Sequence, residues 1–232
     1  MDVTIYVIPG SHPCRTGLLM LEHKGIPHRR VVLKPGFHAP AVRVLGFPGP
    51  TVPAVKIGDE RVQGTRQIAR ALDELKPELP LLPADPERLR AVEEAERFGE
   101  EELQPAARRL VARAGRSDLA ALRDHAGSGR LGLLLNPTPR GRRMTFRLLV
   151  GRIGASEERY RLDREALPGW LDRIDAWIAE GVLHGRELNA ADLQIASSLA
   201  LIDYVLELRP QLESRPAGAL MDRVLPEPAG RG

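Results

Sequence analysis

The first eighty residues alternate between short apolar runs and segments in which apolar positions recur at helical spacing. Residues 3–8 form a β-branched apolar run that stops at Pro9-Gly10, which predicts a buried strand. Similar runs predict strands over 28–33, 52–57 and 61–63, and helical spacing predicts helices over 13–24, 41–45 and 65–75. The predicted order is therefore β-α-β-α-β-β-α.

Beyond this region the strand pattern does not recur. Residues 76–86 hold four prolines, which indicates an extended connection. Helical spacing then predicts helices over 87–114 with a kink at Pro105, and over 118–126, 144–153, 164–180, 190–206 and 217–224, with a loop over 127–141. The predicted organisation is an α/β domain over 1–77, a linker over 78–86, an all-helical domain over 87–225 and a flexible tail over 226–232.

Composition narrows the class of protein. The chain has 232 residues, 43% of them hydrophobic, which is enough to bury a core. No apolar run approaches the roughly 18 residues that a membrane-spanning helix needs. The N-terminus lacks the pattern of a secretory signal, and the single cysteine, Cys14, excludes an intrachain disulfide. The expected location is the cytoplasm, without a membrane partner.

Positive charge is concentrated in the α/β region. Residues 1–80 hold eleven Lys and Arg against seven Asp and Glu, a net charge of +4, whereas the rest of the chain holds 23 against 24. This distribution favours an anionic small-molecule ligand. The basic cluster over 140–143 has no interleaved aromatic residues, which indicates a solvated face, so nucleic acid is not an expected partner. The histidines show no metal-ligand spacing, so no metal site is expected.

The first candidate site is Ser11-His12-Pro13-Cys14, where the first strand passes into the first helix. Free backbone N–H groups and the positive end of the helix dipole favour an anion or a thiolate there, and they can lower the pKa of a cysteine. Alternatively, Ser11 is only an N-cap and Cys14 a small buried apolar residue. His12 is a candidate ligand contact or acid–base group, although a histidine in a polar turn is generally solvated.

Two further segments offer ligand groups. Thr51-Val52-Pro53 precedes a strand, and a cis bond before Pro53 would leave the main chain of Val52 able to pair with an extended ligand; an ordinary edge strand with a trans proline is the alternative. Gln63-Gly64-Thr65 precedes a helix, whose first amides and Thr65 suit a carboxylate, although Thr65 also suits a simple N-cap.

Taken together, these segments resemble the glutathione S-transferase family, whose N-terminal domain has the thioredoxin fold and whose C-terminal domain is all-helical. The matching segments are Ser11-His12-Pro13-Cys14, 21–27, 51–55, 64–68, 71–73, 79–83 and 183–192. In the last of these, Asn189 and Asp192 form a capping-box-like pair before a core helix. Trp170, Trp177 and Tyr204 are expected in the helical core, or one of them beside a substrate cleft.

The resemblance implies a function and a site. Ser11 occupies the place of the catalytic residue that faces the sulfur of glutathione, the expected co-substrate. Val52 would pair with the peptide beside a cis Pro53, and Thr65 would take the γ-glutamyl carboxylate. The expected reaction joins glutathione or another small thiol to a hydrophobic electrophile. Dimers are common in the family, so a homodimer is an option that the sequence leaves open.

One departure from the family pattern bears on the ligand. Members that bind glutathione usually have an acidic residue directly before the Ser or Thr, where this chain has Gly64, preceded by Gln63. Losing that carboxylate costs about 1–3 kcal/mol, or about 10–100-fold in affinity. Two alternatives therefore stand beside the transferase: a non-catalytic binding protein on the same scaffold, and a redox protein that uses Cys14, which lies at the position of the resolving cysteine of dithiol glutaredoxins.

Overall fold

A computed structural model describes residues 2–122 and 139–226 of the chain. The α/β part contains β1 (Val3–Val7), α1 (His12–His23), β2 (Arg29–Val32), α2 (His38–Val44), β3 (Ala54–Ile57), β4 (Glu60–Gln63) and α3 (Thr65–Leu75). The strands form one mixed sheet in the order β2-β1-β3-β4, in which β1 and β2 are parallel and the other pairs antiparallel. The predicted order of elements is confirmed, with bounds that shift by at most three residues.

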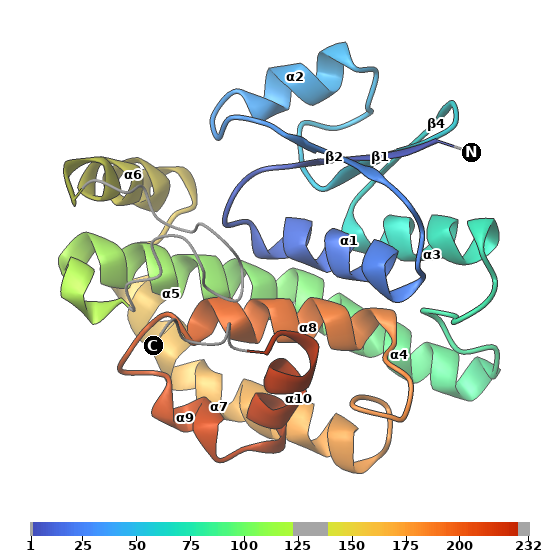
Figure 1. The fold of residues 1–232 in the computed structure, drawn as a ribbon. Coiled ribbons are helices and arrows are strands. Elements are labelled where there is room, and N and C mark those ends of the chain that lie inside the picture. The colour runs from blue at the N-terminus through green and yellow to red at the C-terminus, as the bar shows by residue number, and fades with distance from the viewer. Residues whose placement is uncertain (1, 123–138, 227–232) are drawn as a thin grey trace, which may run out of the picture.

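The sheet is covered on both faces, with α1 and α3 on one side and α2 on the other (Figure 1). All five residues of β1 are buried, as expected for an inner strand without a solvent face. Gly17 allows α1 to lie close to the sheet, because a Cβ atom at this position would be 3.2 Å from Cδ1 of Ile5 and 3.3 Å from Cβ of Pro53. The start of α1 is thereby held against the segment before β3.

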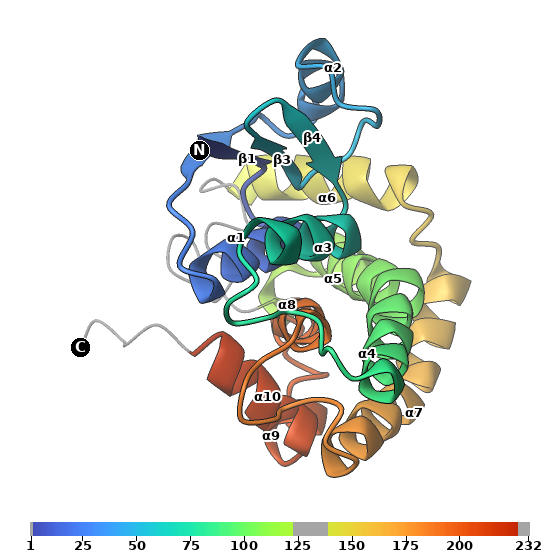
Figure 2. The ribbon, with the colours of Figure 1, turned by 90° about the vertical axis from the view of Figure 1, so that its right-hand side faces the viewer.

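The rest of the described chain is helical, which confirms the predicted fold class. Its elements are α4 (Pro86–Phe98), a π-turn η1 (Gly99–Leu103), α5 (Gln104–Ser117), a 3₁₀ turn η2 (Leu119–Ala121), α6 (Pro139–Arg152), α7 (Glu157–Ala179), α8 (Ala190–Ile202), α9 (Pro210–Glu213) and α10 (Pro216–Val224). Every residue of α8 is buried, and this helix packs against α1, α4, α5 and α10 (Figures 1 and 2). A single hydrophobic core therefore runs from the sheet into the helical part.

The break expected at Pro105 is a π-turn that ends two residues earlier, at Leu103. Proline has no N–H group to donate to the carbonyl one turn earlier, so the α-helical hydrogen-bond ladder loses a bond there. Before the turn, the buried side chain of Gln194 on α8 bonds to the same main chain, since its amide, oriented to suit its neighbours, donates to the Glu96 carbonyl and accepts from the Glu100 N–H, both at 3.2 Å. Helices α4 and α5 thus follow each other without a break in the chain of helical turns, and the π-turn changes the register between them.

The helix predicted over 118–126 is wrong in its described part. Asp118 ends α5 in extended conformation, and its side chain accepts a hydrogen bond from the Ala120 N–H at 2.9 Å, which starts the short turn η2 instead. Residues 123–138, with most of the predicted loop over 127–141, lie outside the described residues. The short helix α9 was missed, and α6 and α7 begin before their predicted starts.

The linker is attached to α1 and α3 by a buried ion pair. The Nζ atom of Lys24, which is fully buried, lies 2.5 Å from Oδ1 of Asp73 and donates to the carbonyls of Glu78 and Leu79. The carboxylate of Asp73 also accepts the main-chain N–H groups of Leu81 and Leu82, each at 2.9 Å. The proline-rich segment is therefore fixed in place. The domain bounds at 77, 86 and 225 stay predictions, and tail residues 227–232 lie outside the described part.

Candidate functional site

The first predicted site residue, Ser11, is the N-cap of α1. Its backbone is extended, and its Oγ atom accepts the Cys14 N–H at the long distance of 3.4 Å. The capping interpretation is therefore confirmed. The cap itself does not use the hydroxyl hydrogen, which can be donated to the sulfur of Cys14 or to a bound thiolate at the half-buried end of the helix. Capping and sulfur binding are compatible roles for this side chain.

Cys14 differs from the reactive cysteine that the helix start suggested. Its side chain is only 2% exposed, and burial raises the pKa of its thiol, although hydrogen bonds from the Ser11 side chain and the Ile8 main chain and the charge of Arg30 act in the opposite direction. Of the two alternatives for Cys14, the buried apolar residue is therefore confirmed, and its pKa is raised because desolvation of the thiolate outweighs the helix terminus. At neutral pH the thiol of Cys14 is protonated, and the side chain packs in the core as a small apolar group.

His12 is buried, whereas a solvated turn residue was expected. Its exposure is 2%, and burial, followed by the charge of Arg108, lowers the pKa of the imidazole to about 3. A hydrogen bond to the Gln104 carbonyl opposes this shift, and Nε2 has no hydrogen-bond partner among the described residues. His12 is therefore a neutral side chain that lies between the start of α1 and α5, and no open turn presents it to a ligand.

Val52 and Pro53 form the centre of the site. The Val52–Pro53 peptide bond is cis, which confirms the geometry that the resemblance implied. Pro53 faces Gly17 of α1, and the carbonyl of Pro53 accepts the Gly64 N–H at 3.4 Å. Pro53 therefore contacts both α1 and the residue that precedes α3. Val52 itself is half-buried, and neither its N–H nor its carbonyl has a hydrogen-bond partner within the described ranges. An extended ligand is free to pair with both groups.

Gln63 supports this segment from the side. Its Oε1 atom accepts the Gly49 N–H at 2.6 Å, and its Nε2 atom donates to the carbonyls of Gly49 and Thr51 at 3.0 and 2.8 Å. Gln63 was predicted to contact the ligand, but both the oxygen and the nitrogen of its amide bond to this loop instead. It fixes the loop that leads into Val52, which is a positioning role.

Gly64 and Thr65 open α3. The N-cap is Gly64, with a φ of 86°, and the expected cap, Thr65, is instead the first helical residue, 3% exposed. No side chain caps this end of α3, so the hydrogen-bonding capacity of its first amides is not taken up by a capping residue. Such an end suits a carboxylate, the group predicted to bind here.

Two sets of residues near these helices had no clear signal in the sequence. On α5, the main chain of Gln104 hydrogen-bonds to His12 and the charge of Arg108 acts on the same imidazole, and both depend on the register set by the π-turn. Arg70 of α3 pairs with Glu93 at 2.7 Å and with the fully buried Glu96 at 3.3 Å, and burial raises the pKa of Glu96 to about 7. Only the alternation of basic residues on 65–75 and acidic residues on 87–102 could have suggested this contact.

The predicted helical-core residues are confirmed in the main. Trp177 and Tyr204 are buried, and Trp177 contacts Phe98 edge to face with centroids 5.4 Å apart, while Trp170 is partly buried against the core. The capping box of Asn189 and Asp192 is also present, and burial raises the pKa of Asp192 to about 6.

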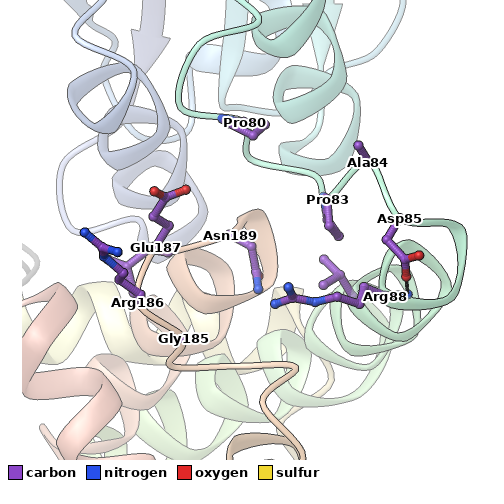
Figure 3. Close-up of a pocket in the computed structure, with 11 residues that line it drawn as sticks. Pro80, Pro83, Ala84, Asp85, Arg88, Gly185, Arg186, Glu187 and Asn189 are labelled. Atoms are coloured by element: carbon purple, nitrogen blue, oxygen red, sulfur yellow. Dashed lines mark hydrogen bonds between the residues drawn. The ribbon is translucent and has the colours of Figure 1, made fainter.

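A pocket of about 410 Å³ lies between the linker, the start of α4 and the segment before α8 (Figure 3). Pro80, Pro83 and Arg88 face Asn189 across it. It contains none of the predicted site residues. Within the described ranges no group of three or more His, Cys, Asp or Glu side chains is placed to hold a metal ion, and no helix is long and apolar enough to cross a membrane.

A mixed four-stranded sheet with a cis-proline before β3, followed by helices packed on α1, defines a thioredoxin-like protein with a helical C-terminal part. Residues 5–80 match the family model of the glutathione S-transferase N-terminal domain. The N-terminal part therefore belongs to that domain family, and the chain as a whole has the glutathione S-transferase-like fold. No curated protein sequence matches the chain.

Solved structures agree with this fold over the whole chain. The glutathione S-transferase CsGST63524 of Ceriporiopsis subvermispora, crystallised with glutathione, is 18% identical with a TM-score of 0.67, and the match covers 100% of both chains. Glutathione transferase GSTFuA3 of Phanerochaete chrysosporium is 18% identical with a TM-score of 0.66, covering 100% and 99%. FzlA from C. crescentus is 20% identical with a TM-score of 0.62, covering 100% and 95%. At these identities the likeness establishes the fold.

Proposed function

We propose that this chain is a glutathione S-transferase-like enzyme that joins a peptide thiol, glutathione in the first instance, to a hydrophobic electrophile. The observation that supports this most is Val52, beside the cis bond to Pro53, whose N–H and carbonyl have no hydrogen-bond partner in the part of the chain that the structure describes. The solved relative from Ceriporiopsis subvermispora was crystallised with glutathione, which favours the same thiol here.

Binding would use main-chain groups for the most part. The peptide would extend along Val52 and hydrogen-bond to its N–H and carbonyl, as an added strand does. Its γ-glutamyl carboxylate would lie at the start of α3, against the uncapped amides and Thr65. Gln63 keeps the Val52 segment in place through its bonds to Gly49 and Thr51. The net positive charge of residues 1–80 favours the anionic peptide.

Catalysis would rest on the start of α1. The Ser11 hydroxyl would donate a hydrogen bond to the sulfur, and the positive end of the helix dipole would further stabilise the thiolate. Both effects lower the pKa of the bound thiol, so that more nucleophile is present near neutral pH. Cys14 has no part in this step, because its thiol is buried and its pKa is raised.

A binding protein without catalysis is the second candidate. Two observations favour it: Gly64 offers no carboxylate to the ammonium group of the peptide, and the amide of Gln63 is occupied by the Gly49 loop. Such a protein would bind glutathione weakly or not at all. The third reading, a redox protein that uses Cys14, is disfavoured by the burial of that thiol.

The test compares Ser11→Ala with Ser156→Ala. Both serines are helix N-caps, but Ser156 opens α7, where its Oγ accepts the Arg159 N–H at 3.1 Å. Removing either cap lowers stability by about 1 kcal/mol. Glutathione binding is followed by calorimetry up to millimolar concentration, and conjugation by absorbance with a chromogenic aryl halide. The proposal expects at least a tenfold loss of rate in Ser11→Ala alone. No binding by the wild type, or equal rates in the two variants, would contradict it.

A further inference from the structure

Large apolar side chains that face solvent are concentrated on two segments of this protein. Among the residues that the structure describes, nine large apolar side chains are exposed, and six of them lie on residues 29–45 or on α6. These six are Val32, Phe37, Val44, Leu45, Met144 and Leu148. The exposed fractions of Phe37, Val44 and Leu148 are 72%, 88% and 68%, so these side chains protrude from the surface. Exposed apolar side chains that gather in this way mark an interaction surface.

The exposed apolar residues of α2 lie opposite the face by which this helix packs on the sheet. Val42 is fully buried, in a small cluster with Tyr6 and Phe47. Phe37 and Val44 are about two helical turns apart and point outward. A surface helix generally has a polar outer face. Helix α2 is apolar on both faces, which burial within the described chain does not explain.

Helix α6 has the same arrangement. Phe146 is buried, whereas Met144 and Leu148, one turn apart on the other side of the helix, are exposed. Figures 1 and 2 show α2 and α6 at the same end of the molecule, above α1 and α5. Burial and then the charge of Arg152, at the end of α6, lower the pKa of His38 at the start of α2, which agrees with this placement. The two outer faces therefore belong to one end of the protein.

Both segments are basic and lie in stretches of sequence without an acidic residue. Residues 23–58 hold six Lys and Arg, residues 125–156 hold another six, and neither stretch contains Asp or Glu. The rest of the chain holds 22 Lys and Arg against 31 Asp and Glu. Among the exposed cations without an ion pair in the described ranges are Lys34, Arg43, Arg147 and Arg152. The protruding apolar side chains thus stand in a positive field, which attracts an anionic partner.

A second copy of the chain does not suit this surface. A two-fold contact would set the same basic patch against itself. Acidic residues of α4 and η1 are in turn occupied by Arg66, Arg70 and Arg173 of their own chain. An anionic lipid bilayer suits both features, because its headgroups neutralise Lys and Arg while apolar side chains enter the acyl boundary. Side chains that protrude from separate elements fit a deformable lipid surface better than the single groove of a protein partner.

We propose that the outer faces of α2 and α6 form a surface that binds anionic lipid membranes peripherally. Phe37, Val44 and Leu148 enter the boundary between headgroups and acyl chains, and Arg43 and Arg147 contact the headgroup phosphates. The sequence-based expectation of no membrane partner concerned helices that span a bilayer, and a contact of this kind does not need one. This inference goes beyond the proposed function and does not depend on it.

The test is co-sedimentation of the full chain with lipid vesicles. One set contains phosphatidylcholine and phosphatidylglycerol in equal amounts, and the other contains phosphatidylcholine alone. The wild type should bind the mixed vesicles at least about tenfold more tightly, because only these carry the anionic headgroups that the basic residues neutralise. Added salt should weaken this binding by screening. A wild type that does not sediment with the mixed vesicles overturns the proposal.

Variants separate the apolar and the basic contributions. Phe37→Ser combined with Val44→Ser should reduce the partition coefficient for mixed vesicles about tenfold or more, since two apolar side chains no longer enter the bilayer. Arg43→Gln combined with Arg147→Gln should reduce binding to mixed vesicles and flatten its salt dependence. All four residues are exposed, so the variants should keep the melting temperature of the wild type. Unchanged partitioning of both double variants contradicts the assignment of the surface.

The matched control is Leu162→Ser combined with Leu206→Ser. Both leucines are exposed, but Leu162 lies on α7 next to Asp163, and Leu206 follows α8 and is next to Glu207. The control removes a similar amount of exposed apolar side chain from outside the proposed surface and should bind mixed vesicles as the wild type does. An equal loss in the control and in the Phe37 and Val44 double variant would mean unspecific adhesion of apolar side chains, and the proposal would be refuted.

An acidic protein partner is distinguished with polyglutamate. This polymer carries negative charge without an apolar phase, so it should bind the wild type more weakly than the mixed vesicles do, and equally to the Phe37 and Val44 double variant. A wild type that binds polyglutamate but not the mixed vesicles overturns the lipid assignment in favour of an acidic polypeptide. Because sedimentation needs no thiol and no electrophile, a failure of the proposed conjugation leaves this test unaffected.

Discussion

The Nζ atom of Lys24 lies 2.5 Å from Oδ1 of Asp73, and it is a fully buried lysine whose hydrogen bonds all go to α3 and the linker. Removing one partner of a buried pair leaves the other charge without compensation, which typically costs 3–5 kcal/mol. Lys24→Met should therefore lower the free energy of unfolding by about 3 kcal/mol, since Asp73 keeps some solvent contact and two main-chain donors. Urea denaturation measures this change.

The control for this prediction is Lys34→Met. The side chain of Lys34 is exposed and makes no hydrogen bond or ion pair with the described residues. A surface substitution of this kind changes stability by less than about 0.5 kcal/mol. Equal effects of the two substitutions would show that the pair with Asp73 adds nothing to the stability of the linker attachment.

The buried carboxyl of Glu96 predicts a pH dependence of stability. Burial raises its pKa from 4.5 to about 7, so the folded state holds a proton that the unfolded state has lost between these values. The stabilising contribution is then fully present below pH 4.5 and is lost as the pH rises through 7. Relative to Glu96→Gln, the wild type should lose roughly 2–3 kcal/mol between pH 4.5 and 8. Parallel stability curves for the two proteins would refute the shift.

Gly64 is predicted to tolerate a side chain poorly. Its φ of 86° is unfavourable for other residues, and a Cβ atom there would lie 2.5 Å from Oε1 of Gln67, which can move aside. Gly64→Ala should therefore cost about 1–2 kcal/mol, mainly from the backbone. Gly169, inside α7 with nothing within 4 Å of such an atom, gives the opposite expectation. Gly169→Ala should stabilise the protein by about 0.5–1 kcal/mol. Melting temperatures of both variants test the contrast.

Cys14 should react slowly in the native state. As the only cysteine, it reports alone on alkylation by iodoacetamide. Its buried position and raised pKa predict a native rate at neutral pH at least about tenfold below that in urea, where the thiol has an ordinary pKa near 8.5. A native rate above the rate in urea would instead indicate an activated thiolate and would return Cys14 to the candidate redox residues.

Local patterns were sufficient to predict most of the fold. The β-branched run that ends at Pro9-Gly10 and the capping pair of Asn189 and Asp192 depend on neighbours in the sequence, and the structure confirms both. The helix predicted after Asp118 failed because an Asp side chain can bond to a nearby N–H and start a turn as readily as a helix.

The candidate site was predicted less completely. The segments of Ser11, Val52 and Thr65 have local signatures, but the burial of His12 depends on α5, more than ninety residues later in the chain. Whether Cys14 is reactive or buried stayed open for the same reason, since a sequence shows the helix start but not the desolvation around it. Gln63 is bound to Gly49 and Thr51 by contacts across the β3–β4 hairpin that no short motif reveals.

The π-turn at Gly99–Leu103 has a consequence for how such a protein can diverge. Each residue turns an α-helix by about 100°, so one codon gained or lost before Gln104 would rotate all of α5 relative to α1. The face of α5 that packs on His12 would then change, while the sheet and the thiol segments kept their sequence. An insertion or deletion at this one turn would therefore repack the start of α1 from outside the α/β part.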